Sequence, residues 1–115
     1  MGKLKLEVRL TAGAEHDLSG IYRRRMVQRG AEGNDGAEAL LNRLVKGIEG
    51  LAAYPERGPV PPELEALGIR AYRQLSLPPY RVIYLPDDAI ITVLIVADSR
   101  RDFRTLLEER VLRGG

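Results

Sequence analysis

The sequence predicts an α+β domain in which a strand and two helices precede three further strands and a last helix. Three observations predict this fold class. The amino-terminal residues alternate between charged and apolar, two later segments carry apolar residues at helical spacing, and three apolar runs separated by turn residues follow. With 115 residues, 44% of them hydrophobic and 30% charged, the chain is expected to form a single domain over residues 1–115.

The first expected strand is KLKLEVRL, residues 3–10, whose leucine and valine side chains would share one face. The first helix is expected after Thr11, which can cap it, and before Gly30, which ends it. Its apolar residues at helical spacing are Ala14, Leu18, Ile21, Tyr22 and Met26. Strand and helix would each bury one side.

The second helix carries the clearest apolar stripe, with Asp35 and Glu38 spaced like a capping box at its start. The stripe consists of Ala37, Leu40, Leu41, Leu44, Val45, Ile48, Leu51 and Ala52. Gly47 lies at its edge, and because a glycine inside a helix costs about 1 kcal/mol relative to alanine, we expect close approach of another helix there. The two helices are predicted to form an antiparallel hairpin.

The proline-rich segment YPERGPVPPELEALG, residues 54–68, predicts an ordered connection over the surface. Three strands are expected after it, at 69–77, 80–85 and 89–97, forming an antiparallel meander that joins the first strand in one sheet. The last run is apolar on both faces, which indicates a central strand. Ser99 and Asp102 have capping spacing before the final helix, whose stripe is Phe103, Leu106, Leu107 and Val111.

Composition excludes several kinds of chemistry. The chain has no cysteine, which removes disulfides, thiolate catalysis and cysteine metal sites. Its single histidine, His16, argues against a zinc site, so we expect no metal and no cofactor. The sequence shows neither a signal-peptide core nor a run of membrane-spanning length, and a cytoplasmic protein without a membrane partner is expected.

Arginine dominates the basic residues, 15 of 18, although the net charge is only +2. Arginine favours phosphate and carboxylate ligands, but a GC-rich genome would produce the same bias. The run Arg23, Arg24 and Arg25 would fan around one helical turn, and we interpret it as a solvated face rather than a phosphate-binding patch. His16, between two acids, is likewise interpreted as a surface residue and not as a catalyst.

A longer acid-free run, between Glu65 and Asp87, contains three arginines. Alternation would place Arg70, Tyr72, Gln74 and Ser76 on one face of their strand, close to Arg81 and to the pair Arg100 and Arg101. This face would bind phosphate or an acidic peptide, or it would be the wet side of an antiparallel sheet. Both interpretations remain open.

Arg81 is the most unusual residue of the run, because in YRVIY it shares a face with Ile83 among apolar neighbours. A guanidinium stays charged and must find an anion, backbone carbonyls or water. No phosphate loop, nucleophile elbow or metal cluster is present. Catalysis, if any, would be metal-free phosphodiester chemistry in which arginine stabilises charge and a tyrosine or glutamate moves the proton. The candidates for moving the proton are Tyr72, Tyr80, Tyr84 and Glu7.

Five segments together resemble the RelE/ParE superfamily of bacterial toxins from type II toxin–antitoxin, or plasmid-stabilisation, operons. They are AEHDLSGIY, LAAYPERG, GIRAYRQL, YRVIY and IITVLIVADSRRDFRTLL, in the family's order and over nearly the whole chain. RelE-like members cleave messenger RNA in the ribosomal A site. Arg81 corresponds to their strand arginine and Arg73 to one of their paired lysines, but neither tyrosine nor histidine follows Asp98. The resemblance therefore assigns no catalytic residue, apart from Arg81 and Arg73 if the protein is a nuclease.

ParE-like members share the fold, have a longer helical hairpin and poison DNA gyrase, and this branch resembles the chain better. Many relatives have histidine where this chain has Asp98. The resemblance implies a gyrase-binding toxin, with a ribosome-dependent endonuclease and a non-toxic antitoxin-binding member as alternatives. It also implies a cognate antitoxin with an acidic arm, and operator DNA bound only through the antitoxin. Candidate residues for antitoxin or target binding are Arg70, Tyr72, Arg73, Arg81, Asp98, Arg100 and Arg101. Arg81 would anchor an antitoxin carboxylate, backbone carbonyls or Asp98.

Overall fold

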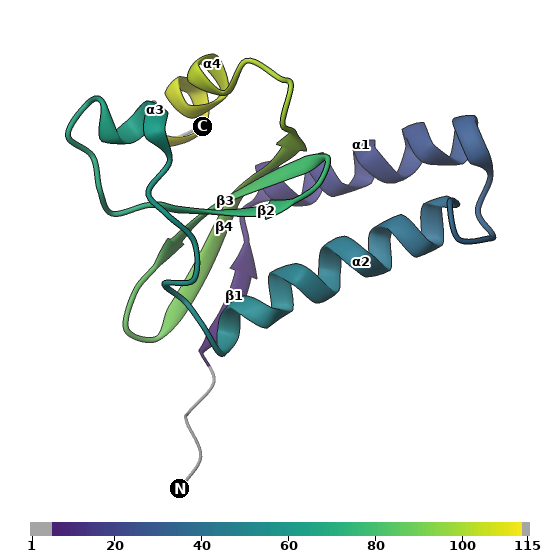
Figure 1. The fold of residues 1–115 in the computed structure, drawn as a ribbon, viewed down its shortest axis with the longest axis horizontal. Coiled ribbons are helices and arrows are strands. Elements are labelled where there is room, and N and C mark those ends of the chain that lie inside the picture. Colours follow the sequence, from purple (N-terminus) through teal and green to yellow (C-terminus); the bar gives the residue numbers. More distant parts are fainter. Residues whose placement is uncertain (1–5, 114–115) are drawn as a thin grey trace, which may run out of the picture.

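A helical hairpin covers one face of a four-stranded sheet in the computed structural model, which describes residues 6–113 (Figure 1). The chain begins with strand β1 (Glu7–Leu10) and the hairpin helices α1 (Ala12–Arg29) and α2 (Ala37–Glu49), extended by the short turn η1 (Gly50–Ala52). Helix α3 (Pro62–Glu65) precedes strands β2 (Arg73–Leu77), β3 (Tyr80–Pro86) and β4 (Ile90–Asp98). Helix α4 (Phe103–Leu107) and the π-helical turn η2 (Glu108–Leu112) end the described chain. The predicted α+β order is confirmed.

The sheet has the order β1-β4-β3-β2, with β1 parallel to β4 and the other neighbours antiparallel. The predicted meander joined to the first strand is therefore confirmed, and β4 is central as its apolar faces indicated. Strand β1 pairs only from Glu7 to Leu10, opposite Ile90 to Val93. Residues 3–5 of the predicted strand lie outside the described residues.

A β-bulge interrupts the alternation of side chains along β4. Ile83 pairs with Ile95 but Tyr84 pairs with Val93, so Leu94 is an extra residue. Val93 and Val96 therefore face the hairpin, while Leu94 and Ile95 face the side covered by α3 and α4. One core cluster lies on each side of the sheet.

The hairpin forms as predicted, with two local corrections. Thr11 caps α1 by accepting the Ala14 N–H at 3.1 Å. The predicted capping box of α2 is wrong, because Gly36 is its N-cap residue and the Asp35 carboxylate instead pairs with Arg25 and Arg29. The element that approaches Gly47 closely also differs from the predicted one. A Cβ there would lie 2.6 Å from a methyl group of Leu77, so the neighbour is strand β2 and not a helix.

The proline-rich connection is not confined to the surface, contrary to the prediction. It contains α3, whose Leu64 is buried, and it closes the outer edge of β2. Gln74 donates its N–H to the Pro59 carbonyl at 2.9 Å, and a Cβ on Gly58 would lie 1.6 Å from the Gln74 carbonyl oxygen. The buried Tyr84 hydroxyl accepts the Gly58 N–H at 3.3 Å. Glycine is therefore required by close packing at this point.

Two further boundaries differ from the prediction. Residues 69–72 are not a strand, so Ile69 and Tyr72, expected on opposite faces, both pack against the cluster under α3 and α4. The last helix is capped by Asp102, which accepts the Thr105 N–H at 3.2 Å, and not by Ser99. Its predicted stripe is confirmed, because Phe103, Leu106 and Leu107 are buried and Val111 packs against them.

Candidate functional site

Arg81 is enclosed between β3, α3 and α4. Strand alternation places it beside Ile83 on the face covered by the two short helices. Its Nη1 and Nη2 donate to the two carboxylate oxygens of Glu63 at 2.9 and 3.0 Å, and its Nε donates to the Gln74 side-chain oxygen at 3.1 Å. The guanidinium carbon lies 4.0 Å from the centre of the Phe103 ring, a cation–π distance.

This network makes Arg81 an internal anchor. Its side chain is only 15% exposed, and the hydrogen bonds from Arg81 hold the pKa of Glu63 below its usual value. From the sequence, Arg81 is expected to anchor an antitoxin carboxylate, backbone carbonyls or Asp98. Of these partners Asp98 is wrong, since the Asp98 carboxylate accepts from Arg100 instead. Sequence reasoning missed Glu63, because its segment was assigned to the surface and no local spacing links it to β3.

The other arginines of the acid-free run do not join Arg81. Arg70 pairs with Glu65 at 2.7 Å, and Arg73 contacts Glu56 and the Gly58 carbonyl at 3.4 Å. Arg70 and Arg73 border a hollow of about 300 Å³ that also has acidic residues at Glu56, Asp87 and Asp88. Tyr72 packs into the core cluster. Acidic residues outside the acid-free run therefore lie beside its arginines and offset their positive charge.

A groove between α1 and the end of β4 is lined by four arginines. It has a volume of about 430 Å³. Its lining is His16, Asp17, Gly20, Arg23, Arg24, Val96, Ala97, Asp98, Arg101 and Arg110. We call these ten residues the basic groove. A second hollow of about 270 Å³, which shares Arg24 and Asp98 with it, adds Arg25, Tyr80 and Arg100.

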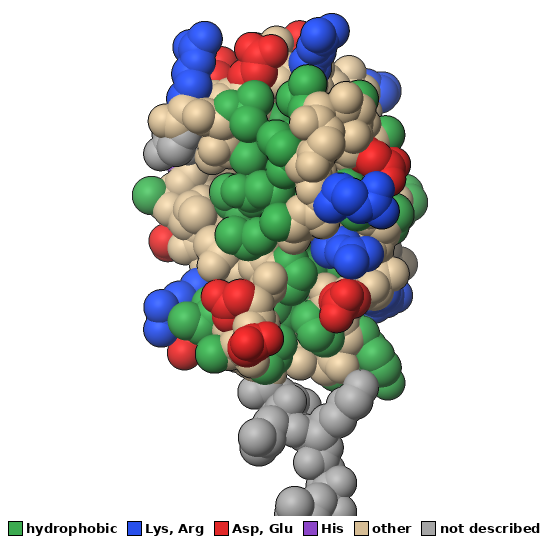
Figure 2. Space-filling model, turned by 90° about the vertical axis from the view of Figure 1, so that its left-hand side faces the viewer, with side chains coloured by type: hydrophobic (Ala, Val, Ile, Leu, Met, Phe, Trp, Pro, Cys, Tyr) green, Lys and Arg blue, Asp and Glu red, His purple; other side chains and the backbone are tan. Residues whose placement is uncertain are grey.

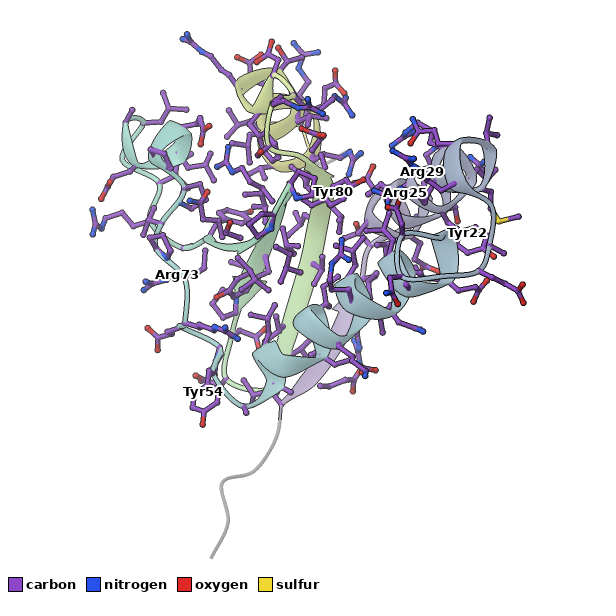
Figure 3. The ribbon with its side chains drawn as sticks, turned by 45° about the vertical axis from the view of Figure 1, so that its right-hand side comes forward. Tyr22, Arg25, Arg29, Tyr54, Arg73 and Tyr80 are labelled. Atoms are coloured by element: carbon purple, nitrogen blue, oxygen red, sulfur yellow. The ribbon has the colours of Figure 1, made fainter. Side chains whose placement is uncertain are left out.

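Residues distant in the sequence meet in this region. Figure 3 shows Tyr80 of β3 on the side of the molecule that carries Arg25 and Arg29 of α1, whereas Arg73 lies on the opposite side. The predicted candidates Asp98, Arg100 and Arg101 thus adjoin the α1 arginines that sequence reasoning assigned to a solvated face. The α1 arginines and the residues at the end of β4, which the sequence analysis treated as separate patches, therefore form one surface.

Both carboxylates of the basic groove already have cationic partners. Asp17 accepts from Arg110 at 2.7 and 3.0 Å, which raises the pKa of Arg110. Asp98 accepts from the Arg100 side chain at 2.8 and 2.9 Å, which lowers the pKa of Asp98 to about 2.

Three arginines of the basic groove remain without such partners. The side chains of Arg23, Arg24 and Arg101 make no hydrogen bond or ion pair with any other residue of the described range 6–113. The groove therefore carries excess positive charge and is suited to an anionic partner.

A fourth hollow, apolar in character, lies between α3 and α4. It measures about 340 Å³ and is lined by leucines at 64, 67, 107 and 112, with charged residues at its border. Leu67 is 60% and Leu112 48% exposed. Figure 2, which views the molecule from the α3 side, shows a continuous band of hydrophobic side chains bordered by charged ones. This face offers apolar contact area rather than charge.

Two kinds of feature are missing from residues 6–113. No group of three histidine, aspartate or glutamate side chains there is arranged to hold a metal ion. No helix in the same range is long and apolar enough to cross a membrane.

Solved structures of toxin–antitoxin systems resemble this fold, and two of them serve as examples. The chromosomal ParDE toxin–antitoxin system of P. aeruginosa matches with a TM-score of 0.65 and 19% identity, covering 84% of this chain and 98% of that chain. The toxin–antitoxin complex RelBE2 of Mycobacterium tuberculosis matches with a TM-score of 0.59 and 22% identity, covering 87% and 98%. At such identities the likeness concerns the fold. No curated protein sequence matches this chain.

A helical hairpin on a four-stranded sheet is the fold shared with these structures, and the family match given next places the chain in the RelE/ParE superfamily, as the sequence predicted. The profile of the family described as ParE toxin of type II toxin–antitoxin system, parDE, matches residues 8–103. The chain therefore belongs to the ParE toxin family.

Proposed function

We propose that this ParE-type toxin inhibits growth by binding DNA gyrase rather than by cleaving RNA, and that a cognate antitoxin neutralises it. The observation that carries the proposal is the engagement of Arg81, the residue a nuclease mechanism would need most. Its Nη atoms hold Glu63 and its Nε holds Gln74, so a phosphate would first have to displace an internal carboxylate.

Two of the other residues named for cleavage are engaged as well. Arg73 contacts Glu56 and a backbone carbonyl, and the Tyr84 hydroxyl is buried against Gly58. Phosphodiester cleavage requires a group that moves a proton beside the group that stabilises charge. These contacts favour action by binding, for which the exposed arginines and the apolar hollow provide surface.

Neutralisation by an antitoxin would combine the two kinds of surface. Apolar anchors would occupy the hollow between α3 and α4, where Leu67 and Leu112 are exposed. Acidic side chains would pair with arginines that lack partners within the toxin. Such a complex would leave fewer exposed cations and leucines than the toxin alone.

The test is induction of the protein in growing cells, followed by measurement of plasmid supercoiling and of transcript integrity. The proposal expects growth arrest, loss of gyrase-dependent supercoiling and intact transcripts. Purified protein added to gyrase should block supercoiling of relaxed plasmid at stoichiometric concentrations, and co-expression of the cognate antitoxin should restore growth. Cleaved transcripts with normal supercoiling would establish the endonuclease alternative. Normal growth with neither change would establish a non-toxic member.

A further inference from the structure

The edge of β4 that faces β1 is only partly covered. The pairing with β1 ends at Val93, whose carbonyl accepts the Thr11 N–H at 3.0 Å. Beyond that point the chain turns into α1, and β4 continues for five residues without a strand on this side. An uncovered strand edge presents backbone donors and acceptors to any extended chain.

An ion pair occupies the first part of this edge. The Asp17 carboxylate accepts the Val96 N–H at 3.0 Å, and Arg110 Nη1 donates to the Leu94 carbonyl at 2.8 Å. Asp17 and Arg110 also bind each other, and their side chains are 13% and 17% exposed. The pair therefore satisfies backbone groups that a neighbouring strand would otherwise satisfy, and it fixes where an added strand would begin.

The next backbone groups on the same edge point into the basic groove. Ser99 donates its N–H to Pro79 of the β3 side, so in the antiparallel ladder Ala97 also faces β3, while Val96 and Asp98 face away from it. The Val96 carbonyl and the Asp98 N–H are thus directed outward. No residue between 6 and 113 pairs with these two groups.

Free cations surround these backbone groups. Arg23 and Arg24 of α1 line one wall of the basic groove, and Arg101 follows β4 on the other. The groove has no phenylalanine, tyrosine or tryptophan in its lining, the residues on which nucleic-acid bases stack. Unpaired backbone groups beside unpaired arginines match an extended peptide with acidic side chains.

We propose that the basic groove binds an extended acidic peptide segment, which adds to the edge of β4 at Val96 and Asp98 and places carboxylates against Arg24 and Arg101. The peptide backbone donates to the Val96 carbonyl and accepts from the Asp98 N–H, and alternate side chains point toward the arginines. The acidic arm of the antitoxin is the expected source, and this last point rests on the proposed function.

The probe is a synthetic ten-residue peptide in which glutamate alternates with valine, blocked at both ends and carrying a fluorophore. Anisotropy measures its binding to the purified full-length chain at low and high salt. Binding is expected to weaken at high salt because exposed charges are screened. On binding, amide NMR shifts should concentrate at residues 96–98, and hydrogen exchange of the Asp98 N–H should slow.

Two matched controls separate charge from backbone pairing. The double variant Arg24→Gln/Arg101→Gln should weaken binding at least tenfold, whereas Arg43→Gln, which removes an exposed arginine of α2 outside the groove, should leave it unchanged. A peptide with glutamine in place of glutamate should lose affinity, and so should one with N-methylated valines.

Several outcomes would overturn the proposal. These are unchanged affinity of the double variant, equal binding of the glutamine peptide, or NMR shifts that avoid residues 96–98. Tighter binding of a twelve-nucleotide single strand that displaces the peptide would assign the groove to nucleic acid instead. The peptide experiment uses neither growth nor gyrase, so its failure is distinguishable from failure of the proposed toxicity.

Discussion

Removal of the carboxylate that holds Arg81 tests whether this arginine is a structural anchor. In Glu63→Gln the amide can accept only one of the two hydrogen bonds, at 2.9 and 3.0 Å, that the carboxylate accepts. Hydrogen bonds to charged groups contribute about 1.5–3 kcal/mol. Because the side chain of Arg81 is 15% and that of Glu63 28% exposed, water compensates part of the loss. We expect Glu63→Gln to lower the free energy of unfolding by about 1.5 kcal/mol.

A double-mutant cycle isolates the pair. Arg81→Met removes the ion pair and the cation–π contact with Phe103 and should cost about 3 kcal/mol, near the lower limit for breaking a buried ion pair. The coupling energy between the two positions should be about 1 to 2 kcal/mol in urea unfolding at pH 7. Arg70 and Glu65 provide the matched control, because they lie 2.7 Å apart but are 68% and 50% exposed. Their coupling should stay below about 0.5 kcal/mol.

The pH dependence supplies an independent check on the same pair. The folded pKa of Glu63 lies below its value in the unfolded chain, so in the acid range the unfolded chain binds more protons. The stabilisation is therefore complete above about pH 4.5, the usual range for glutamate, and disappears as the pH falls through the folded pKa. The coupling energy between Arg81 and Glu63 should therefore fall to zero in this acid range. A coupling at pH 7 no larger than that of Arg70 and Glu65 would refute the anchor role.

Three further changes have definite expected outcomes. Gly58→Ala should lower the free energy of unfolding by about 3 kcal/mol or more, because its Cβ would lie 1.6 Å from the Gln74 carbonyl oxygen; wild-type stability in urea would contradict this packing. Tyr84→Phe should cost about 1–3 kcal/mol by leaving the Gly58 N–H buried without an acceptor, and an unchanged urea midpoint would argue against that hydrogen bond. Asp98 should titrate at about pH 2 in a carboxyl-carbon NMR titration, and Arg100→Ala should move its pKa upward; no movement would mean that Arg100 is not the cause.

Elements with strong local patterns were predictable from the sequence. The hairpin helices, the order of the strands and the central position of β4 follow from periodicity and capping residues. Errors occurred where a distant residue decides the local structure. Residues 69–72 alternate like a strand, but Ile69 and Tyr72 pack together under α3 and α4 and not across a sheet. The proline-rich connection has the composition of a surface loop, yet Leu64 within it is 1% exposed.

The candidate site was predictable only in part, because pairing of charges depends on the fold. The sequence named Asp98, Arg100 and Arg101 as candidates near the end of the last strand; in the fold Asp98 and Arg101 line the basic groove and Arg100 lines the hollow beside it. The contribution of Arg24 could not be recognised, because nothing in its own segment indicates that α1 crosses the end of β4. For the same reason the sequence could not identify the partner of Arg81, because Glu63 is 18 residues away in sequence.

Balance of charge along the sequence is therefore a poor guide to balance of charge in space. The acid-free run appeared to be the basic surface, but Glu63, Glu65 and Glu56 approach its arginines from outside the run. Of the arginines left free, only Arg101 has an acidic neighbour in the sequence, and the acids nearest to these arginines along the chain are engaged elsewhere. Asp17 accepts a backbone N–H of β4, and Asp102, the neighbour of Arg101, accepts the Thr105 N–H as a helix cap. A carboxylate that accepts a backbone N–H is fixed in position by that hydrogen bond, so it does not form an ion pair with an arginine near it in the sequence. The groove keeps unpaired arginines because its two carboxylates are held by Arg110 and Arg100 and by backbone N–H groups.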